Sequence, residues 1–166
     1  MRRQVTISSI LSWINLVCWG LGCLFLLLAT AGGGILFLIM AFFMSAIPLH
    51  SYAAIQFHKH LKNPAVPLKR QTLSGLRFMG FVVIFFGITM LINSVAALQN
   101  TKELLKAEQE MMSRMPQAQN MTEGTIRAAG VLGILLGLSL LANVILNTRL
   151  LRWYHLSKEQ ENKERS

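Results

Sequence analysis

The sequence predicts an all-α fold, an integral membrane four-helix bundle. The first observation behind this prediction is composition: 53% of the 166 residues are hydrophobic and only 14% are charged, whereas about a quarter of a soluble domain is charged. The second is the distribution of charge, because long segments contain no Asp, Glu, Lys or Arg. Together these observations exclude a soluble globular enzyme, a disordered chain and a disulfide scaffold.

The first two spans lie between Arg3 and Lys59, where residues 4–58 carry no charge. One helix of this length would extend for about 80 Å at 1.5 Å per residue, while the hydrocarbon core of a bilayer is about 30 Å thick. The segment must therefore cross the membrane twice. The sequence Thr-Ala-Gly-Gly-Gly at residues 30–34 is poor in helix formers and marks the break, which places the spans at residues 7–29 and 35–56.

The other two spans are uncharged segments in the second half of the chain, at residues 78–98 and 128–148. Each is close to the length of about 20 residues that a spanning helix needs. Helices are required because, in lipid, every backbone N–H has to be paired within its own segment. The four spans thus form two helical hairpins within a single membrane domain, residues 1–166.

Basic residues predict the orientation of the bundle. Twelve of them lie in the N-terminus, the second connection and the C-terminal end, and four lie in the third connection, together with four Glu residues. Because an excess of Lys and Arg marks the cytoplasmic side, both termini are expected in the cytoplasm. Residues 57–77 then form a basic cytoplasmic loop, 99–127 an external amphipathic loop and 149–166 a charged cytoplasmic tail. The expected location is an integral, multi-pass position in a membrane, the cytoplasmic (inner) membrane if the source is bacterial.

The external loop contains apolar side chains at helical spacing from Thr101 to Met115. We expect the third helix to continue outward as an amphipathic extension until Pro116, which cannot continue a helix. An apolar stripe of this kind packs on the protein itself, on the bilayer surface or on a partner. Candidate partner surfaces are this stripe and the basic rim on the cytoplasmic side: Leu104, Met111 and Met115, and Lys59, Lys62 and Arg70.

One histidine, His50, lies well inside the second span, where an ionisable residue indicates a functional site by default. Pro48 precedes it by two residues and should kink the helix, freeing the carbonyl of Met44. The structural alternative is a neutral His50 that hydrogen-bonds to such a carbonyl or to a nearby hydroxyl. Asparagines in the other spans either hydrogen-bond across the bundle or line a polar path. The candidate intramembrane polar site comprises His50, Pro48, Ser45, Asn93 and Asn143.

Small residues recur on one face of each helix in the second hairpin. They are spaced by seven residues in the third span and by four in the fourth. Small side chains let helix backbones approach closely, and van der Waals contact is the main force between helices in lipid. The face is either an oligomer interface or the packing surface of the third helix on the fourth. The residues concerned are Gly80, Gly87, Ser94, Ala129, Gly133 and Gly137.

The sequence contains no Gly-rich phosphate loop, no Ser/His/Asp set and no zinc motif. We therefore expect a non-enzymatic protein without cofactor or metal: an accessory, assembly or interaction subunit of a membrane complex, or a small homo-oligomer. Its expected partners are anionic headgroups of the bilayer at the cytoplasmic rim, and a membrane protein or a second copy of the chain, but not nucleic acid.

Two alternative functions remain open from the sequence. One is an oligomeric channel or transporter with a polar path near His50. The other is a haem- or metal-associated redox subunit, in which His50 and His155 would have to face each other at one depth. The position of His155 beyond Arg152 argues against that pairing.

Overall fold

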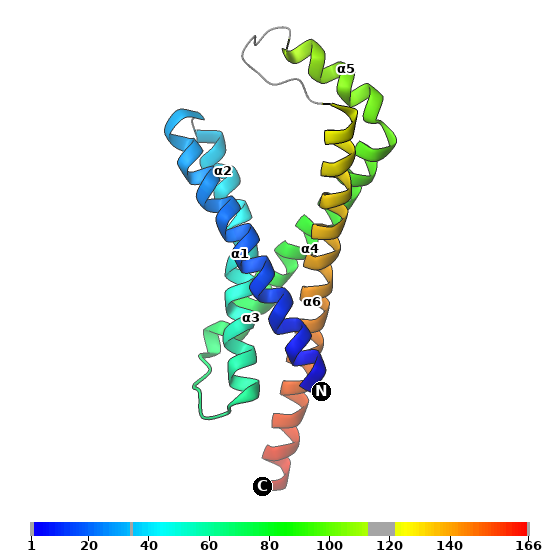
Figure 1. The fold of residues 1–166 in the computed structure, drawn as a ribbon. Helices are drawn as coiled ribbons and strands as arrows, with labels where there is room; N and C mark the ends of the chain where they lie inside the picture. Colours follow the sequence, from blue (N-terminus) through cyan, green and yellow to red (C-terminus); the bar gives the residue numbers. More distant parts are fainter. Residues whose placement is uncertain (1, 34, 113–121, 166) are drawn as a thin grey trace. The chain divides into compact units, whose positions relative to one another are not determined.

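The computed structural model describes residues 2–33, 35–112 and 122–165, and within them the regular secondary structure is helical (Figure 1). The helices follow the chain as α1 Arg2–Gly33, α2 Ile35–Met44, α3 Ala46–Lys62, α4 Arg70–Gln99, α5 Thr101–Met112 and α6 Glu123–Arg165. Within the described part of the chain, four helical segments are long and apolar enough to cross a membrane: Arg3–Thr30, Ile35–Lys62, Gln71–Gln99 and Glu123–Glu161. The prediction of an all-helical fold with four segments able to span a membrane is confirmed.

The helices extend beyond the spans predicted from hydropathy. α3 continues to Lys62 and α4 begins at Arg70, so residues 63–69 alone connect them, in place of the predicted loop 57–77. α6 continues to Arg165 through the segment predicted as a tail. The reason is that hydropathy marks where the lipid ends, whereas a helix ends only where its backbone finds another partner. Asn63 provides such an end, since its side-chain Oδ1 accepts the N–H of Ala65 over 3.2 Å and its carbonyl accepts the N–H of Val66 over 3.0 Å.

The second span is interrupted at Ser45, between α2 and α3. Pro48 follows three residues later and has no N–H for the carbonyl of Met44, so the helical hydrogen-bond ladder lacks one member there. The bonds on either side persist, from the Ser45 N–H to Ala41 (2.9 Å) and from the Leu49 N–H to Ser45 (3.1 Å). The expected kink is therefore a local break at Ser45, and α3 follows α2 directly in the chain.

The amphipathic extension after the third span is helical up to Met112, but it is a separate helix, α5. The Thr101 hydroxyl donates to the carbonyls of Ala97 (2.9 Å) and Leu98 (3.1 Å), which satisfies the end of α4. Asn100 lies in a bend and its carbonyl accepts the N–H of Leu104 over 3.0 Å, which begins α5. Met115 and Pro116 lie outside the described residues.

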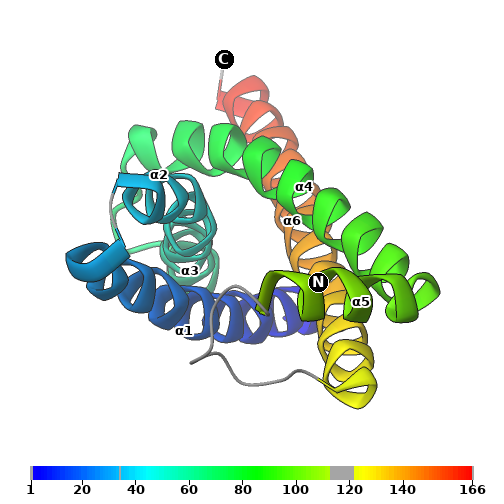
Figure 2. The ribbon, with the colours of Figure 1, turned by 90° about the horizontal axis from the view of Figure 1, so that it is seen from above.

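The chain divides into two compact units. Unit 1 comprises Met1–Ile84 and Leu140–Ser166, and unit 2 comprises Phe85–Ser139, so α4 and α6 contribute to both. Within unit 1, α1 lies beside α2 and α3 in both views (Figures 1 and 2). A cluster of apolar side chains joins α3, α4 and α6 at one end of unit 1, and Val5 of α1 packs against it. The buried members are Ala54, Phe57, Leu76, Leu150 and Leu151.

Candidate functional site

A chain of buried polar side chains links α1, α3 and α6 inside unit 1. The Ser8 hydroxyl donates to Asn147 Oδ1 over 2.9 Å, and the Ser12 hydroxyl donates to Asn143 Oδ1 over 2.9 Å. Asn147 Nδ2 donates to Asn143 Oδ1 over 3.1 Å, which joins the two pairs. His58 Nε2 lies 2.8 Å from Asn147 Oδ1, and since that oxygen is an acceptor, Nε2 carries the proton. We call this set the polar ladder.

Sequence spacing places the members of each pair in the polar ladder on one helix face. Ser8 and Ser12 are four residues apart on α1, and Asn143 and Asn147 are four apart on α6, so each pair shares one helix face. All four side chains are no more than 1% exposed. In a span, polar side chains turn toward the protein because hydrocarbon offers them no partner.

His50 lies at the contact between α3, α4 and α6, and no hydrogen bond joins it to the polar ladder among the described residues. Its side chain is 1% exposed. A Cβ added at Gly80 would lie 3.3 Å from His50 Cε1 and 3.5 Å from Val144, so the glycine leaves the space that the imidazole occupies. A backbone group of Leu76 lies near the ring, but neither ring nitrogen has a partner in hydrogen-bonding geometry among the described residues.

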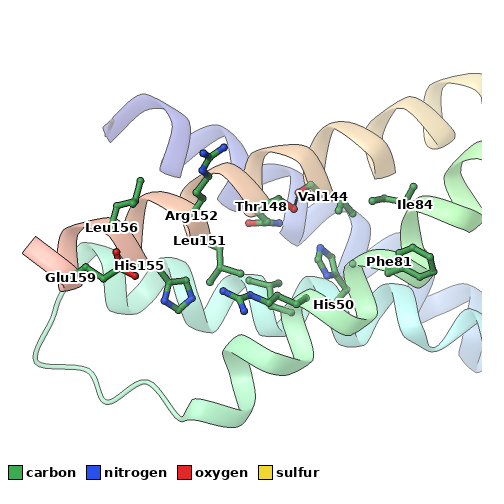
Figure 3. Close-up of a pocket in the computed structure, with 14 residues that line it drawn as sticks. His50, Phe81, Ile84, Val144, Thr148, Leu151, Arg152, His155, Leu156 and Glu159 are labelled. Atoms are coloured by element: carbon green, nitrogen blue, oxygen red, sulfur yellow. Dashed lines mark hydrogen bonds between the residues drawn. The ribbon is translucent and has the colours of Figure 1, made fainter.

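His50 lines a pocket of about 700 Å³ that lies entirely within unit 1, which we call the His50 pocket. Its walls are α3, the first half of α4 and the second half of α6. Figure 3 shows the lining side chains extending from Phe81 and Ile84 at one end to His155 and Glu159 at the other. The pocket therefore joins an apolar region to a region with ionisable groups.

The other residues of the predicted polar site are placed as follows. Asn143 belongs to the polar ladder, and Ser45 donates to the carbonyl of Phe42 over 2.6 Å within its own helix turn. Pro48 lies two residues before His50 and is half-buried. Asn93 is exposed and belongs to unit 2. Of the predicted set, Asn143 alone lies in the hydrogen-bonded network.

The small residues of the second hairpin serve two different contacts. Gly80 packs against His50 in unit 1, as described above. In unit 2, Cβ atoms added at Gly133 and Gly137 would collide with Ser94 and with Leu91 of α4, and Gly87 is the backbone neighbour of Gly137. These residues therefore pack α4 on α6 within one chain. Ala129 is exposed, and its neighbour Gly130 contacts Leu98 instead.

The candidate partner surfaces involve α5, the end of α3 and the start of α4. Leu104 is 43% exposed on α5, and Lys59 and Lys62 are exposed at the end of α3. Arg70 begins α4, and Met111 lies in α5. Met115 lies outside the described residues.

Sequence reasoning missed the hydrogen-bonded pairing of Ser8, Ser12, His58 and Asn147. It also missed the two arginines that line the His50 pocket, Arg77 and Arg152. The available signal was the repeat of polar residues four apart in two otherwise apolar spans. Among the described residues no group of three or more His, Cys, Asp or Glu is placed to hold a metal ion.

The two pocket histidines come from different helices, His50 from α3 and His155 from α6. Along α6, His155 lies eleven residues beyond Val144, which packs beside Gly80 and His50, or about 16 Å at 1.5 Å per residue. No protein-family model, curated protein or solved structure matches this chain.

Proposed function

We propose that this chain is a non-enzymatic integral membrane protein of the interaction class, an accessory or assembly subunit or a small homo-oligomer. The observation that carries the proposal is the small share of the spanning helices that is buried within the chain. In Arg3–Thr30 and in Gln71–Gln99, 17% of the most apolar window is buried within the chain. The exposed side chains include large apolar groups, among them Phe25 (74%), Phe42 (75%) and Phe81 (77%).

Two further features support a docking role. α5 carries Leu104 on an exposed position next to charged side chains, which suits a partner that has both apolar and polar groups. Lys59 and Lys62 at the end of α3 provide positive charge where anionic headgroups or an acidic partner would lie. We place this basic end on the cytoplasmic side and α5 on the external side, following the distribution of Lys and Arg.

The test is native mass spectrometry of the full chain purified in mild detergent. We expect either a second protein at fixed stoichiometry or a homo-oligomer. Leu104→Gln should release a partner that docks on α5, whereas the matched variant Lys106→Gln, on the opposite face of the helix, should retain it. A wild-type protein that is monomeric and carries no second protein would contradict the proposal.

A second candidate is a transporter or channel, which the His50 pocket favours because it places an unpartnered imidazole inside a span. In this case the path would involve oligomerisation and would run past His50. Flux through liposomes that contain the protein is the measurement. Equal flux in the wild type and in His50→Ala would remove His50 from any such path.

A further inference from the structure

The His50 pocket is amphiphilic along its length. Arg152, His155 and Glu159 lie at successive turns of α6 at one end, while Phe81 and Ile84 of α4 form the other end with Val144. From Val144 to His155 the distance along α6 is about 16 Å at 1.5 Å per residue. A ligand that fills this pocket therefore has a charged part and an apolar part.

The charged end is cationic. Arg77 of α4 and Arg152 of α6 both line the pocket, and Glu159 is the one carboxylate among its described lining residues. Both arginine side chains are exposed, and among the described residues no hydrogen bond or ion pair occupies either guanidinium. Guanidinium groups match the geometry of phosphate oxygens and bind them with two parallel hydrogen bonds.

The deep part of the pocket contains a second unsatisfied group, His50. Its ring is 1% exposed, and among the described residues only a backbone group of Leu76 lies near it, without good hydrogen-bonding geometry at either ring nitrogen. A buried polar group without a partner costs about 1–3 kcal/mol, and such groups are rare in folded proteins. A polar group of a bound molecule would relieve this cost.

The distance between the two polar positions limits the ligand. Arg77 precedes Gly80 by three residues, close to one turn of α4, and Gly80 contacts the His50 ring. The backbone of Arg77 thus lies about one turn of α4 from the residue that contacts the imidazole, and both side chains line the same pocket. A glycerophospholipid has this arrangement, because its glycerol joins a phosphate to ester carbonyls that lead into acyl chains.

We propose that the His50 pocket binds one glycerophospholipid with an anionic headgroup. The phosphate accepts hydrogen bonds from Arg77 and Arg152, an ester carbonyl accepts one from the His50 N–H, and the acyl chains lie along Phe81 and Ile84. A lipid quinone would satisfy His50 but would leave the two arginines without a role. The net positive charge of the two arginines and Glu159 favours an anionic lipid over a zwitterionic one.

The test measures which lipid stays bound to the full chain. Protein reconstituted in vesicles of phosphatidylcholine and phosphatidylglycerol in equal amounts is released into detergent and analysed by native mass spectrometry. We expect one phosphatidylglycerol per chain to survive activation that strips phosphatidylcholine. The double variant Arg77→Gln, Arg152→Gln should lower the ratio of the two retained lipids about tenfold, a factor that corresponds to about 1.4 kcal/mol.

Matched variants separate this site from general charge and from folding. Arg149→Gln removes an exposed arginine from the same helix, outside the pocket lining, and should leave the ratio unchanged. His50→Leu should lower retention of phosphatidylglycerol, and His50→Gln, which restores an amide donor, should recover part of it. If the double variant does not fold, Arg77→Gln and Arg152→Gln are measured singly.

Three outcomes would overturn the proposal. They are equal retention of both lipids by the wild type, an equal loss in Arg149→Gln, and displacement of the lipid by soluble glycerol phosphate, which would indicate a site for a free anion. The retained lipid and the co-purifying protein appear as different masses in the spectra. Loss of lipid selectivity therefore leaves the proposed interaction role standing, and the absence of a protein partner leaves the lipid site standing.

Discussion

At the scale of single residues, Asn147 is the centre of the polar ladder. Its Oδ1 accepts from Ser8 and His58, and its Nδ2 donates to Asn143. Interhelical hydrogen bonds, such as the two that Asn147 accepts from Ser8 and His58, contribute about 0.6 kcal/mol each in membrane proteins, with a maximum near 1.7 kcal/mol. The larger effect arises when one partner is removed and the others stay buried and unpaired.

Asn147→Leu should therefore lower the free energy of unfolding by about 1–3 kcal/mol, more than Ser8→Ala, which removes a single bond. Reversible unfolding in mixed detergent micelles measures both. The matched control is Asn93→Leu, because Asn93 is exposed and makes no contact in the polar ladder. If Asn93→Leu and Asn147→Leu lower the free energy of unfolding equally, the polar ladder does not stabilise the fold.

Gly80 is the second residue whose role is local, since it leaves room for His50. Gly80→Leu should lower the melting temperature because its side chain would enter the space of the His50 ring, which lies 3.3 Å from a Cβ at that position. Gly75→Leu on the same helix meets nothing within 4 Å and should be neutral or stabilising, because leucine favours helix over glycine by up to about 1 kcal/mol. Thermal unfolding of the two variants gives the comparison. Equal melting temperatures would show that the His50 ring can move aside without loss of stability.

At the scale of elements, the close contact of α4 and α6 in unit 2 depends on glycines facing Ser94 and Leu91. In lipid there is no hydrophobic driving force between helices, so van der Waals contact at close backbone approach is a main source of their association energy. The same feature explains why a G-x-x-x-G pattern is ambiguous in a sequence. It marks a helix face that packs closely, and either another helix of the chain or a second chain satisfies it.

Gly133→Ala tests this contact. The new methyl group would meet Ser94 Oγ, and Ser94 Cβ would lie 3.2 Å away, so we expect a loss of about 1–3 kcal/mol, as for overpacked cores. Gly124→Ala, whose nearest atom is at 3.7 Å, is the control on the same helix. Adding Ser94→Gly to Gly133→Ala should restore part of the stability. If the double variant is no more stable than Gly133→Ala alone, the new methyl group does not clash with Ser94.

At the scale of the whole molecule, the orientation in the membrane is a prediction from charge. Cysteines introduced at Ala65 and Gln160, in a chain whose own Cys18 and Cys23 are replaced by alanine, should react with an impermeant thiol reagent only after the cells are opened. A cysteine at Gln117 should react in intact cells. The physical reason is that Lys and Arg are retained on the cytoplasmic side during insertion. Labelling of Ala65 and Gln117 from the same side would contradict the four-span topology.

The number and approximate position of the spans could be predicted because they follow from local physics. A helix is the one way to satisfy the backbone of residues such as 78–98 in lipid, and the thickness of the bilayer sets its length. The break before Pro48 also follows from the residue itself, which has no N–H. The helix ends were less predictable, since α3 and α6 continue past the apolar segments with side chains that pack at the end of unit 1, such as Tyr154.

By itself, the sequence determined that this is a helical chain with four segments able to span a membrane, because solvation in lipid acts on each segment separately. The tertiary structure alone decided which polar residues meet. It joined Asn143 and Asn147 to Ser8 and Ser12 across more than 130 positions, and it placed Gly80 against His50. It also brought Arg77 and Arg152 to one pocket. Such contacts depend on how helices far apart in the chain rotate and cross, and hydropathy or spacing within a single helix contains no information about that.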